Sequence, residues 1–458
     1  MPMQTRLKSC VVSRNRCDIS LKKKPADAET IVGITIILIA LGGPPMKVIV
    51  EATHLKKGMY VSELDRPWLE TPFLFQGFRI TNKEEVDQIQ SLCAFVFVDI
   101  DKSKVPVTPT MSNAAPASVK SEKQNVAKLI REPLPYTEKF EDEFSRARAC
   151  YQQATKEVSA LFEDARMGNS LDVAGAKTTV TGMLDSILRH PDAMVLLASI
   201  GNKDKGLVTH ALSVCTLSLA FGRYLGLKNG EMADLGLGAL LHDIGKIKLP
   251  DQVLNNAVNA SEEEKALLEG HTMIGAMMLK NLEGLPENVV AIVHDHHERS
   301  DGSGYPRSLG CSEIGVQTKI VSVVDTYDSI TRGVHGYQSI RADEALKSIY
   351  AWRRDLFDEL LVEKFIQCVG IYPLGSIVEL RTGQIGIVIT SSPDARLFPR
   401  IMLILDADGK PVEPPKMVNL ALFRDKLDTD DFVVKRLVDG ERYDIDVRQY
   451  ILRELPLG

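Results

Sequence analysis

The spacing of apolar residues changes several times along the chain, and the first regular pattern begins at residue 46. Short runs rich in β-branched and aromatic residues predict β-strands, and they occupy residues 47–50, 58–61, 73–75 and 95–98. A helical pattern over residues 84–92 separates the last two runs. We therefore expect a small α+β regulatory module over residues 46–104. The next segment is rich in Pro, Ser, Thr and Ala, which predicts a linker over residues 105–137.

The middle of the chain has the periodicity of amphipathic helices. Charged, periodic segments predict connecting helices within residues 138–200, namely at 138–166 and 172–188. About seven further helix-like segments follow between residues 206 and 351. Ser261 and Glu264 have the spacing of a capping box, which would start one of these helices. These patterns predict an all-helical domain over residues 201–370.

Strand-like alternation is found near the end of the chain. It covers residues 375–380, 386–390 and 401–405, and the turn sequence Ala407-Asp408-Gly409 follows. We expect a small β-rich appendage over residues 371–458. The predicted fold class is therefore a multidomain, mainly α protein, with a helical domain between a small α+β module and the β-rich appendage.

Composition narrows the classes of function. The chain has 458 residues and a net charge of −6, without the basic excess that is typical of proteins that bind duplex nucleic acid. Its seven cysteines are odd in number and include no CxxC pair, so we expect free thiols in a reducing cytoplasm. The apolar run Ile31–Leu41 is shorter than the ~20 residues that span a bilayer. We therefore expect no membrane span.

Residues 1–45 lack the patterns that follow them. We expect a disordered extension here, with an over-long gene start as the alternative. The run Ile31–Leu41 could also be the core of a signal peptide, but Asp27 and Glu29 precede it and Gly-Gly-Pro-Pro follows it, which is a poor cleavage site.

Histidine and aspartate residues of the central region carry the main chemical signal. Their contexts are Thr209-His210, His242-Asp243-Ile244-Gly245-Lys246, Gly270-His271, His296-His297-Glu298, and Asp325 after an apolar run. Imidazole and carboxylate together suit iron, manganese, zinc or nickel, and the absence of thiol ligands argues against a structural zinc site. A carboxylate beside a histidine can bridge two cations, which together can promote an in-line phosphoryl displacement. Lys246 follows Asp243 by one helical turn, so its ammonium could meet a phosphate held there.

Each histidine also has a simpler interpretation. His210 and His242 lie in apolar helical stripes, where a single histidine is more often a core residue bonded to the backbone. The ordered combination rarely arises for packing alone, and it favours a metal site. No ligand role is expected for the remaining histidines, which are His54, His190, His294 and His335. The glycines and proline of Asp301-Gly302-Ser303-Gly304-Tyr305-Pro306 predict a tight loop, either a plain turn or a cover for the metal site.

These residues together resemble the HD-GYP family of HD-superfamily phosphohydrolases. The resemblance covers roughly residues 200–370 and rests on the segments His242–Lys246, His296–Glu298, Asp301–Pro306 and Val324–Asp328. The N-terminal module is similar to a domain of unknown function (DUF3391-like) that often precedes HD-GYP domains, through Leu55–Val61 and Asp65–Leu69.

The resemblance implies a bacterial metal-dependent phosphodiesterase that hydrolyses cyclic di-GMP to linear pGpG or GMP, with two divalent ions of iron or manganese. Carried over by position, one ion would be held by His210, His242, Asp243 and Asp325, and the other by His271, His296, His297 and a shared oxygen of Asp243. Lys246 would contact a substrate phosphate. The loop residues Asp301, Gly302, Gly304, Tyr305 and Pro306 would form a structural and partner-contact element. Candidate partners are cyclic di-GMP, other cyclic dinucleotides and diguanylate cyclases (GGDEF proteins).

Two departures from the family pattern qualify this expectation. Relatives with a third metal have a glutamate one turn before the first ligand histidine, where this chain has Gly206, so we expect two metals. The stretch Val334-His335-Gly336-Tyr337 lacks the basic residues that the family commonly has there. We therefore expect weaker substrate binding, unless Lys319, Arg332 or Arg341 supplies the missing contacts.

Three functions are compatible with these observations. The first is the phosphodiesterase. The second is a catalytically weak receptor for a cyclic dinucleotide, suggested by the stretch at 334–337. The third is a phosphatase or nucleotidase of the wider HD superfamily, against which the loop at 304–306 argues. The complete ligand set and Lys246 favour the enzyme.

Overall fold

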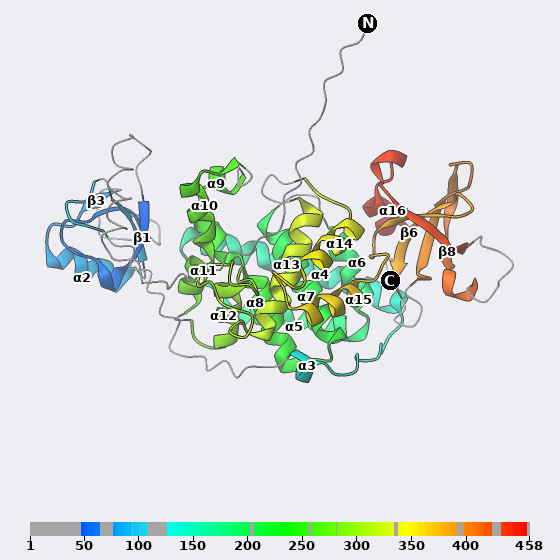
Figure 1. Cartoon of the computed structure of the whole chain (residues 1–458), viewed down its shortest axis with the longest axis horizontal. Coiled ribbons are helices and arrows are strands. Elements are labelled where there is room, and N and C mark those ends of the chain that lie inside the picture. The colour runs from blue at the N-terminus through cyan, green and yellow to red at the C-terminus, as the bar shows by residue number, and fades with distance from the viewer. Residues whose placement is uncertain are drawn as a thin grey trace, which may run out of the picture.

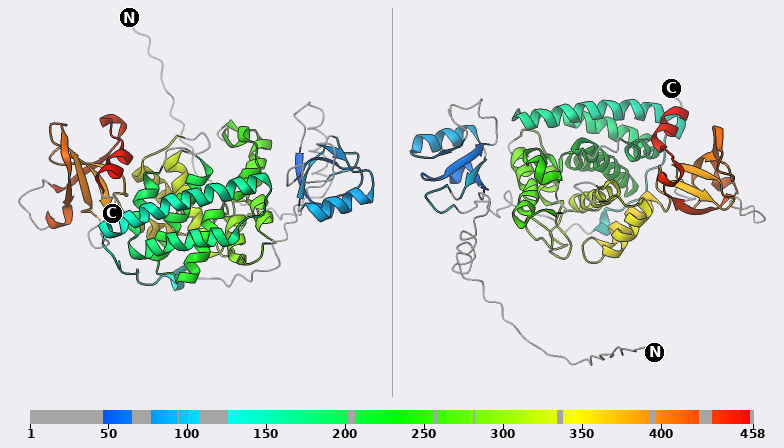
Figure 2. Two further views of the ribbon diagram at one scale, coloured as in Figure 1. Left: turned by 180° about the vertical axis from the view of Figure 1, so that it is seen from behind. Right: turned by 90° about the horizontal axis from the view of Figure 1, so that it is seen from above.

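The described part of the chain forms three units that lie in a row. The computed structural model describes residues 47–64, 77–93, 95–100, 102–107, 126–201, 206–255, 259–280, 282–333, 338–391, 397–423 and 432–455. The N-terminal module lies at one end, the helical domain in the middle and the β-rich unit at the other end (Figure 1, Figure 2). The extension expected at 1–45, the strand expected at 73–75 and the stretch 334–337 lie outside the described residues.

The N-terminal module is a four-stranded antiparallel sheet with the order β1-β4-β2-β3. Its elements are β1 (Lys47–Glu51), η1 (Ala52–His54), β2 (Tyr60–Leu64), β3 (Phe78–Arg79), α2 (Lys83–Leu92) and β4 (Phe95–Asp99). Asn82 and Glu85 form a capping box that starts α2, which stabilises the free N–H groups of its first turn. The strands predicted at 47–50 and 95–98 and the helix predicted at 84–92 are confirmed, while the strand predicted at 58–61 begins at Tyr60.

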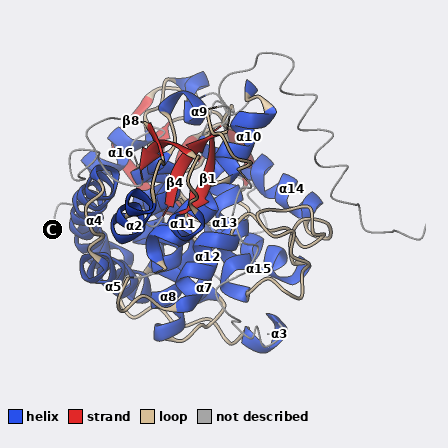
Figure 3. Cartoon of the chain, turned by 90° about the vertical axis from the view of Figure 1, so that its left-hand side faces the viewer, coloured by secondary structure: helices blue, strands red, loops and turns tan. Residues whose placement is uncertain are grey.

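Strand β4 is buried on both faces, and this joins the module to the helical domain. Val96 and Val98 face the core of the module. Side chains alternate along a strand, so Phe95 and Phe97 face the opposite way, where they pack with Leu249 and Ile274. Figure 3 looks from this end, with β1 and β4 in front of the helical domain.

The helical domain is built around α7, which packs against α4, α5, α6, α8 and α13. Its elements are α3 (Val126–Leu129), α4 (Phe140–Met167), α5 (Val173–Arg189), α6 (Pro191–Ser199), α7 (Leu207–Tyr224), α8 (Asn229–Leu241), η3 (Ile244–Lys248), α9 (Asp251–Asn255), α10 (Glu262–Glu269), α11 (His271–Leu279), α12 (Glu287–Asp295), α13 (Val316–Arg332), α14 (Ala342–Trp352) and α15 (Glu359–Val369). Helix α7 is buried on almost every side, which explains why its sequence is apolar nearly all round.

Most of the predicted helices are confirmed, including the capping box of Ser261 and Glu264 at the start of α10. The described residues between 206 and 351 contain eight α-helices instead of about seven. One of them, α9, has only five residues, too few to show a helical period. The later part of the expected linker is packed as well, because Val126 is buried in the main core and the N–H of Arg131 donates to the Leu225 carbonyl.

The C-terminal unit is an antiparallel sheet with the order β8-β7-β6-β5-β9. Its elements are β5 (Ile377–Leu380), β6 (Ile385–Thr390), β7 (Arg400–Leu405), β8 (Pro411–Asn419), η6 (Leu420–Phe423), β9 (Val434–Val438), η8 (Glu441–Tyr443) and α16 (Val447–Glu454). The first three strands are confirmed predictions. We did not predict β8, because Pro414 and Pro415 interrupt its alternation. Strand β8 lies at the edge of the sheet, where proline is tolerated because it need not donate a hydrogen bond to a neighbouring strand.

The C-terminal unit packs directly against the helical domain, so it is more than a loosely attached appendage. Ile387, Ile389 and Met402 on one face of the sheet belong to the same buried cluster as the helices. Val388 and Ile401, which alternate with them, belong to a separate cluster on the other face. Both faces of the sheet are therefore buried. No helix in the described ranges is long and apolar enough to cross a membrane.

Candidate metal centre

The proposed ligands lie at places where helices begin, end or meet. His210 is in the first turn of α7, and His271 is the first residue of α11. His242 caps the C-terminal end of α8, and Asp243 caps the N-terminal end of η3. A Cβ at Gly245 would collide with the carbonyl oxygen of His271. Glycine at this position therefore lets η3 approach α11 and brings Asp243 beside His271.

Seven histidine and aspartate residues converge into two neighbouring groups. The first group is His210, His242 and Asp325, and the second is Asp243, His271, His296 and His297; within each group the ligand atoms lie within 4.8 Å of one another. These are the two sets expected from the sequence, with Asp243 between them. The seven come from five separate places in the chain, at 210, 242–243, 271, 296–297 and 325, so the helical packing creates the site.

Asp243 has the geometry of a bridging carboxylate. Its Oδ2 lies 3.5 Å from His210 Nε2 and 3.4 Å from His242 Nε2. Its Oδ1 lies 3.2 Å from His271 Nε2 and 3.6 Å from His296 Nε2. One oxygen therefore faces each group. Because Asp243 Oδ1 is buried and is without a hydrogen-bond partner among the described residues, a cation is the partner that would satisfy it.

Backbone carbonyls orient three of the rings. The Nδ1 of His242 lies 2.8 Å from the Ala239 carbonyl oxygen, and that of His296 lies 3.0 Å from the Val293 carbonyl oxygen. His271 makes the same contact with Leu268. A carbonyl oxygen only accepts, so each Nδ1 carries the proton. The Nε2 lone pairs are left to face the metal groups, as ligands require.

His210 is oriented differently, by a carboxylate that the sequence reasoning did not assign. Its Nδ1 lies 2.8 Å from Oδ2 of Asp328, which is itself held by Ser213 and Arg332. A carboxylate behind a ligand histidine fixes the ring and makes it a stronger base. The available signal was the spacing of Asp325 and Asp328, which are one helical turn apart on the same face of α13.

Burial and charge both shape the protonation of the ligands. Burial lowers the pKa of His296 to about 4, so this ring is neutral at neutral pH. Burial alone would also lower the pKa of His242, but Asp243 and Asp325 raise it to about 10. Burial raises the pKa of these two carboxyl groups, yet nearby cationic groups hold both well below the usual range. Binding of a cation would therefore displace protons from the imidazoles.

The donor set fits divalent transition metals. It combines imidazole nitrogens and carboxylate oxygens without thiolate sulfur, which suits iron, manganese or zinc. His210, His242, Asp243 and Asp325 would hold one ion, and His271, His296, His297 and Asp243 the other. Each of these residues is buried or nearly so, which keeps bulk water from competing for them.

The loop after α12 covers the second group. The ring of Tyr305 stacks on His297, with the ring centroids 4.7 Å apart. A Cβ at Gly304 would overlap the backbone of His297 and Glu298, so glycine is needed for the loop to pass this close. Glu298, another residue without an assigned role, accepts from the backbone N–H groups of Arg307 and Leu309. These contacts fix the loop, and Tyr305 with it, against a ligand histidine.

The outer part of the loop has a different environment. The carboxylate of Asp301 is exposed and accepts from the Ser303 N–H, and Asp301 pairs with Gly310 across the loop. Gly302 has a φ of 79°, a left-handed conformation that glycine adopts at little cost. Asp301 and Gly302 therefore shape the turn and lie on its outer side.

The four basic candidates are placed very differently. Lys246 Nζ lies 2.6 Å from Asp243 Oδ2, at the metal groups. Lys319 is buried beside Asp358, 3.5 Å away, and beside Cys311. Arg332 donates to both carboxylate oxygens of Asp328 and to the Ala198 carbonyl. Arg341 pairs with Asp343 and Glu344 at the start of α14. Lys246 is thus the candidate that lies at the metal groups, and a substrate contact of the other three stays a prediction.

The described cysteines and the other described histidines lie outside the two ligand groups. Cys93, Cys150, Cys215, Cys311 and Cys368 are free thiols. His294 pairs with the carboxylate of Asp295, and His190 packs against aromatic rings. His335 lies outside the described residues.

Comparisons with known proteins identify the families that the chain resembles. Family profiles match a domain of unknown function (DUF3391) over residues 48–176, an HD domain over 195–361 and a KOW domain associated with HD domain over 377–425. The chain is 32% identical over 374 residues to the cyclic di-GMP phosphodiesterase PA4108 of Pseudomonas aeruginosa, across 81% of this chain and 88% of that protein.

Shorter matches involve related enzymes. The chain is 35% identical over 144 residues to the cyclic di-GMP phosphodiesterase response regulator RpfG of Xanthomonas campestris, across 31% of this chain and 38% of that one. It is 30% identical over 141 residues to 3′3′-cGAMP-specific phosphodiesterase 1 of Vibrio cholerae, across 31% of this chain and 32% of that one. The long match to PA4108 and the HD profile show that the chain belongs to the HD-GYP family of HD-domain proteins.

Proposed function

We propose that the chain is a metal-dependent phosphodiesterase that hydrolyses cyclic di-GMP to linear pGpG or GMP. The bridging position of Asp243, with one oxygen towards each ligand group, is the observation that carries the proposal. The relative that matches along most of its length bears the name of this activity. A simple receptor would have no need of a bridging carboxylate between two metal groups.

Asp243, Lys246 and Tyr305 would have different roles in the reaction. Two bound cations would supply a polarised water and neutralise charge on the phosphate. Asp243 spaces the two groups and shares its oxygens between them. Lys246 is held beside Asp243 and is mostly buried, so its ammonium can donate to a phosphate oxygen where the charge is poorly screened. Tyr305 restrains the His297 ring and shields the second group from solvent.

The test is hydrolysis of cyclic di-GMP by the full chain loaded with Mn²⁺ or Fe²⁺, with the products separated by chromatography. We expect linear pGpG or GMP, and no product from Asp243→Asn. A matched control is Lys248→Met, which changes a half-buried lysine on the same short helix η3. Tight binding of cyclic di-GMP without turnover by the metal-loaded protein would contradict the proposal and favour a receptor.

A second substrate is favoured by one comparison. A relative that is 30% identical over 141 residues is named for 3′3′-cGAMP. The same metal chemistry would cut either ring, since both contain the same phosphodiester bonds. Measuring kcat/KM for both cyclic dinucleotides in parallel decides between them. If kcat/KM is higher for 3′3′-cGAMP, then 3′3′-cGAMP replaces cyclic di-GMP as the proposed substrate.

A further inference from the structure

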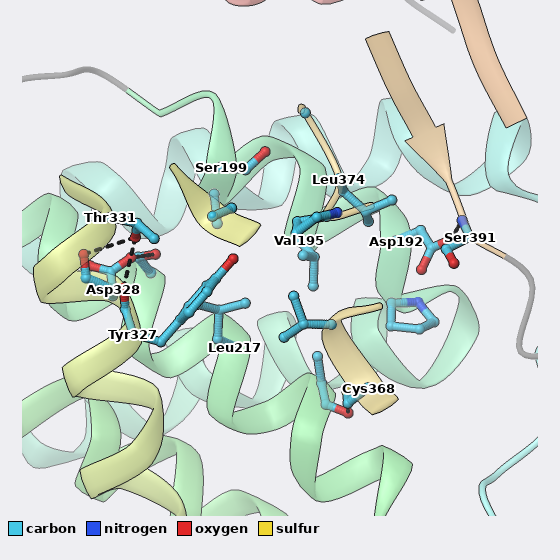
Figure 4. Close-up of a pocket in the computed structure, with 18 of the residues that line it drawn as sticks. Asp192, Val195, Ser199, Leu217, Tyr327, Asp328, Thr331, Cys368, Leu374 and Ser391 are labelled. Atoms are coloured by element: carbon cyan, nitrogen blue, oxygen red, sulfur yellow. Dashed lines mark hydrogen bonds between the residues drawn. The ribbon is translucent and has the colours of Figure 1, made fainter. Parts of the chain in front are cut away.

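A second enclosed space lies away from the metal ligands, where the helical domain meets the C-terminal unit. Its volume is about 530 Å³, within the range of small-molecule sites. Helices α6, α7, α13 and α15 and the segments beside β5 and β6 line it. Figure 4 shows Asp192 and Ser391 at one end and Tyr327, Asp328 and Thr331 at the other.

Two buried, oppositely charged groups line one end of this cavity. Asp192 is 8% exposed and Arg223 is 3% exposed. One oxygen of Asp192 accepts from the Ser391 N–H at 3.0 Å. Arg223 donates to the Pro135 carbonyl, but its Nε is buried and is without a hydrogen-bond partner among the described residues. A buried guanidinium N–H left unpaired is costly, but this Nε has almost no accessible surface, so a ligand would contact other atoms of Arg223, which lines the cavity.

The charge of Asp192 is also incompletely compensated. Burial raises the pKa of this carboxyl to about 7, although Ser391 and Arg223 act in the opposite direction. Donors from a ligand would stabilise the carboxylate form. The lining of the cavity therefore offers both an acceptor, Asp192, and a donor, Arg223.

The other lining groups indicate a neutral, aromatic occupant. The two acids Asp192 and Asp328 are balanced by the two bases Arg223 and Arg332, so neither an anion nor a cation is favoured. Four aromatic rings offer flat apolar faces, from Tyr136, Tyr224, Tyr327 and Phe365, which suits stacking with a planar ring. Serine hydroxyls at 199, 339, 376 and 391 provide further polar contacts.

We propose that this cavity is a binding site for a neutral guanine base or nucleoside. Guanine presents two N–H donors side by side, which Asp192 can accept, and a neighbouring carbonyl, which can accept from Arg223. The balanced charges of the lining disfavour cyclic di-GMP itself, because it carries two negative phosphates. The choice of guanine rests on the proposed function, whose substrate contains this base, whereas the cavity and its polar groups do not depend on it.

Hydrogen bonds connect residues that line the cavity to the metal centre. Asp328 lines the cavity and also holds the Nδ1 of the ligand His210. Ser213 and Arg332, which hold Asp328, line it too. An occupant would therefore contact the groups that orient one metal ligand, without touching the metal positions.

The test is calorimetric titration of the full chain with guanosine, with adenosine as the matched probe because it lacks the paired N–H donors. We expect guanosine to bind and adenosine to bind at least tenfold more weakly. Asp192→Asn keeps the shape of the side chain and removes a buried charge, so it should fold. It should weaken guanosine binding by about 10- to 150-fold, the effect of losing one charged hydrogen bond. Asp185→Asn, an exposed carboxylate on α5, should have no effect.

The other outcomes separate this site from the metal centre. Guanosine binding that survives Asp192→Asn but is lost in Asp243→Asn would place the nucleoside at the metals and overturn the proposal. Equal affinity for both nucleosides, or no binding of guanosine, would also overturn it. Binding that depends on Asp192 in a protein that fails to hydrolyse cyclic di-GMP would refute the proposed function and leave the cavity site standing.

Discussion

Replacing Asp328 by asparagine should weaken one metal site and spare the other. Asp328 Oδ2 accepts from His210 Nδ1 at 2.8 Å, while its Oδ1 accepts from Ser213. An asparagine has only one accepting oxygen, so one of these bonds must be lost, and its NH₂ group would also face the Nε–H of Arg332. His210 would lose either its partner or the charge that makes it a strong base.

The expected loss of metal affinity can be estimated from other carboxylates that hydrogen-bond to a metal-binding histidine. Removing one typically lowers metal affinity by about 10- to 100-fold, which is about 1.4–2.8 kcal/mol. Only the first group contains His210. The second group should therefore keep its affinity. At a free Mn²⁺ concentration that fills both wild-type sites but not the weakened first site, the variant should bind about half the metal that the wild-type chain binds.

The assay is a competition titration of Mn²⁺ against a chelator, which resolves two binding steps in the wild-type chain. Asp343→Asn is the matched control, because Asp343 pairs with Arg341 and Lys347 on α14 and is not among the metal ligands. Two unchanged binding constants would refute the role given to Asp328. Equal weakening of both constants would show that the change disturbs the fold instead of one ligand.

Three further changes test other parts of the site. Lys246→Met should keep both metals and lower kcat by about 10²–10³-fold, as for other electrostatic stabilisers; metal loss on elemental analysis would contradict this. Gly304→Ala should displace the loop from His297 and reduce activity, whereas Gly230→Ala, where a Cβ meets nothing within 4 Å, should not. Since burial raises the pKa of Asp192 to about 7, its charge costs stability above that pH and the cost fades as the pH falls towards 3.8. Asp192→Asn should therefore stabilise the protein more at about pH 8 than at about pH 5, by roughly 3 kcal/mol in unfolding free energy, because each pH unit between 5 and the pKa of about 7 contributes about 1.4 kcal/mol. An equal gain in unfolding free energy at both pH values, measured by denaturant titration, would refute the assignment.

The seven residues that converge in the two groups could be selected from the sequence because metal chemistry restricts which residues can serve as ligands. His242-Asp243 and His296-His297 stand out against apolar helices, and the resemblance to a family ordered them. Asp328 was harder to recognise, since one acidic residue a turn beyond a ligand is also common on solvent-exposed helix faces. Its role depends on His210, which lies 118 residues away in the chain and becomes a neighbour only through the packing of α7 on α13.

Partners that are distant in sequence also limit what local patterns can predict. Lys319 was a candidate for a substrate contact, and the neighbouring residues do not show that its ammonium lies beside Asp358, 39 residues later. Local patterns predicted the strands β5, β6 and β7, yet they could not show that one face of this sheet would be buried against the helical domain. A continuous apolar run along a strand indicates burial of both faces, but it does not identify the surface that covers each face.

The two flanking units reach different halves of the metal centre. Phe95 and Phe97 of the N-terminal sheet pack with Leu249, directly after η3, and with Ile274 of α11. Lys246 lies on η3 and His271 on α11, so this contact adjoins the second ligand group. The C-terminal unit instead lines the cavity beside Asp328, behind His210 of the first group. Each ligand group is thus supported from a different side, and we expect a movement of either unit to affect first the group on its own side.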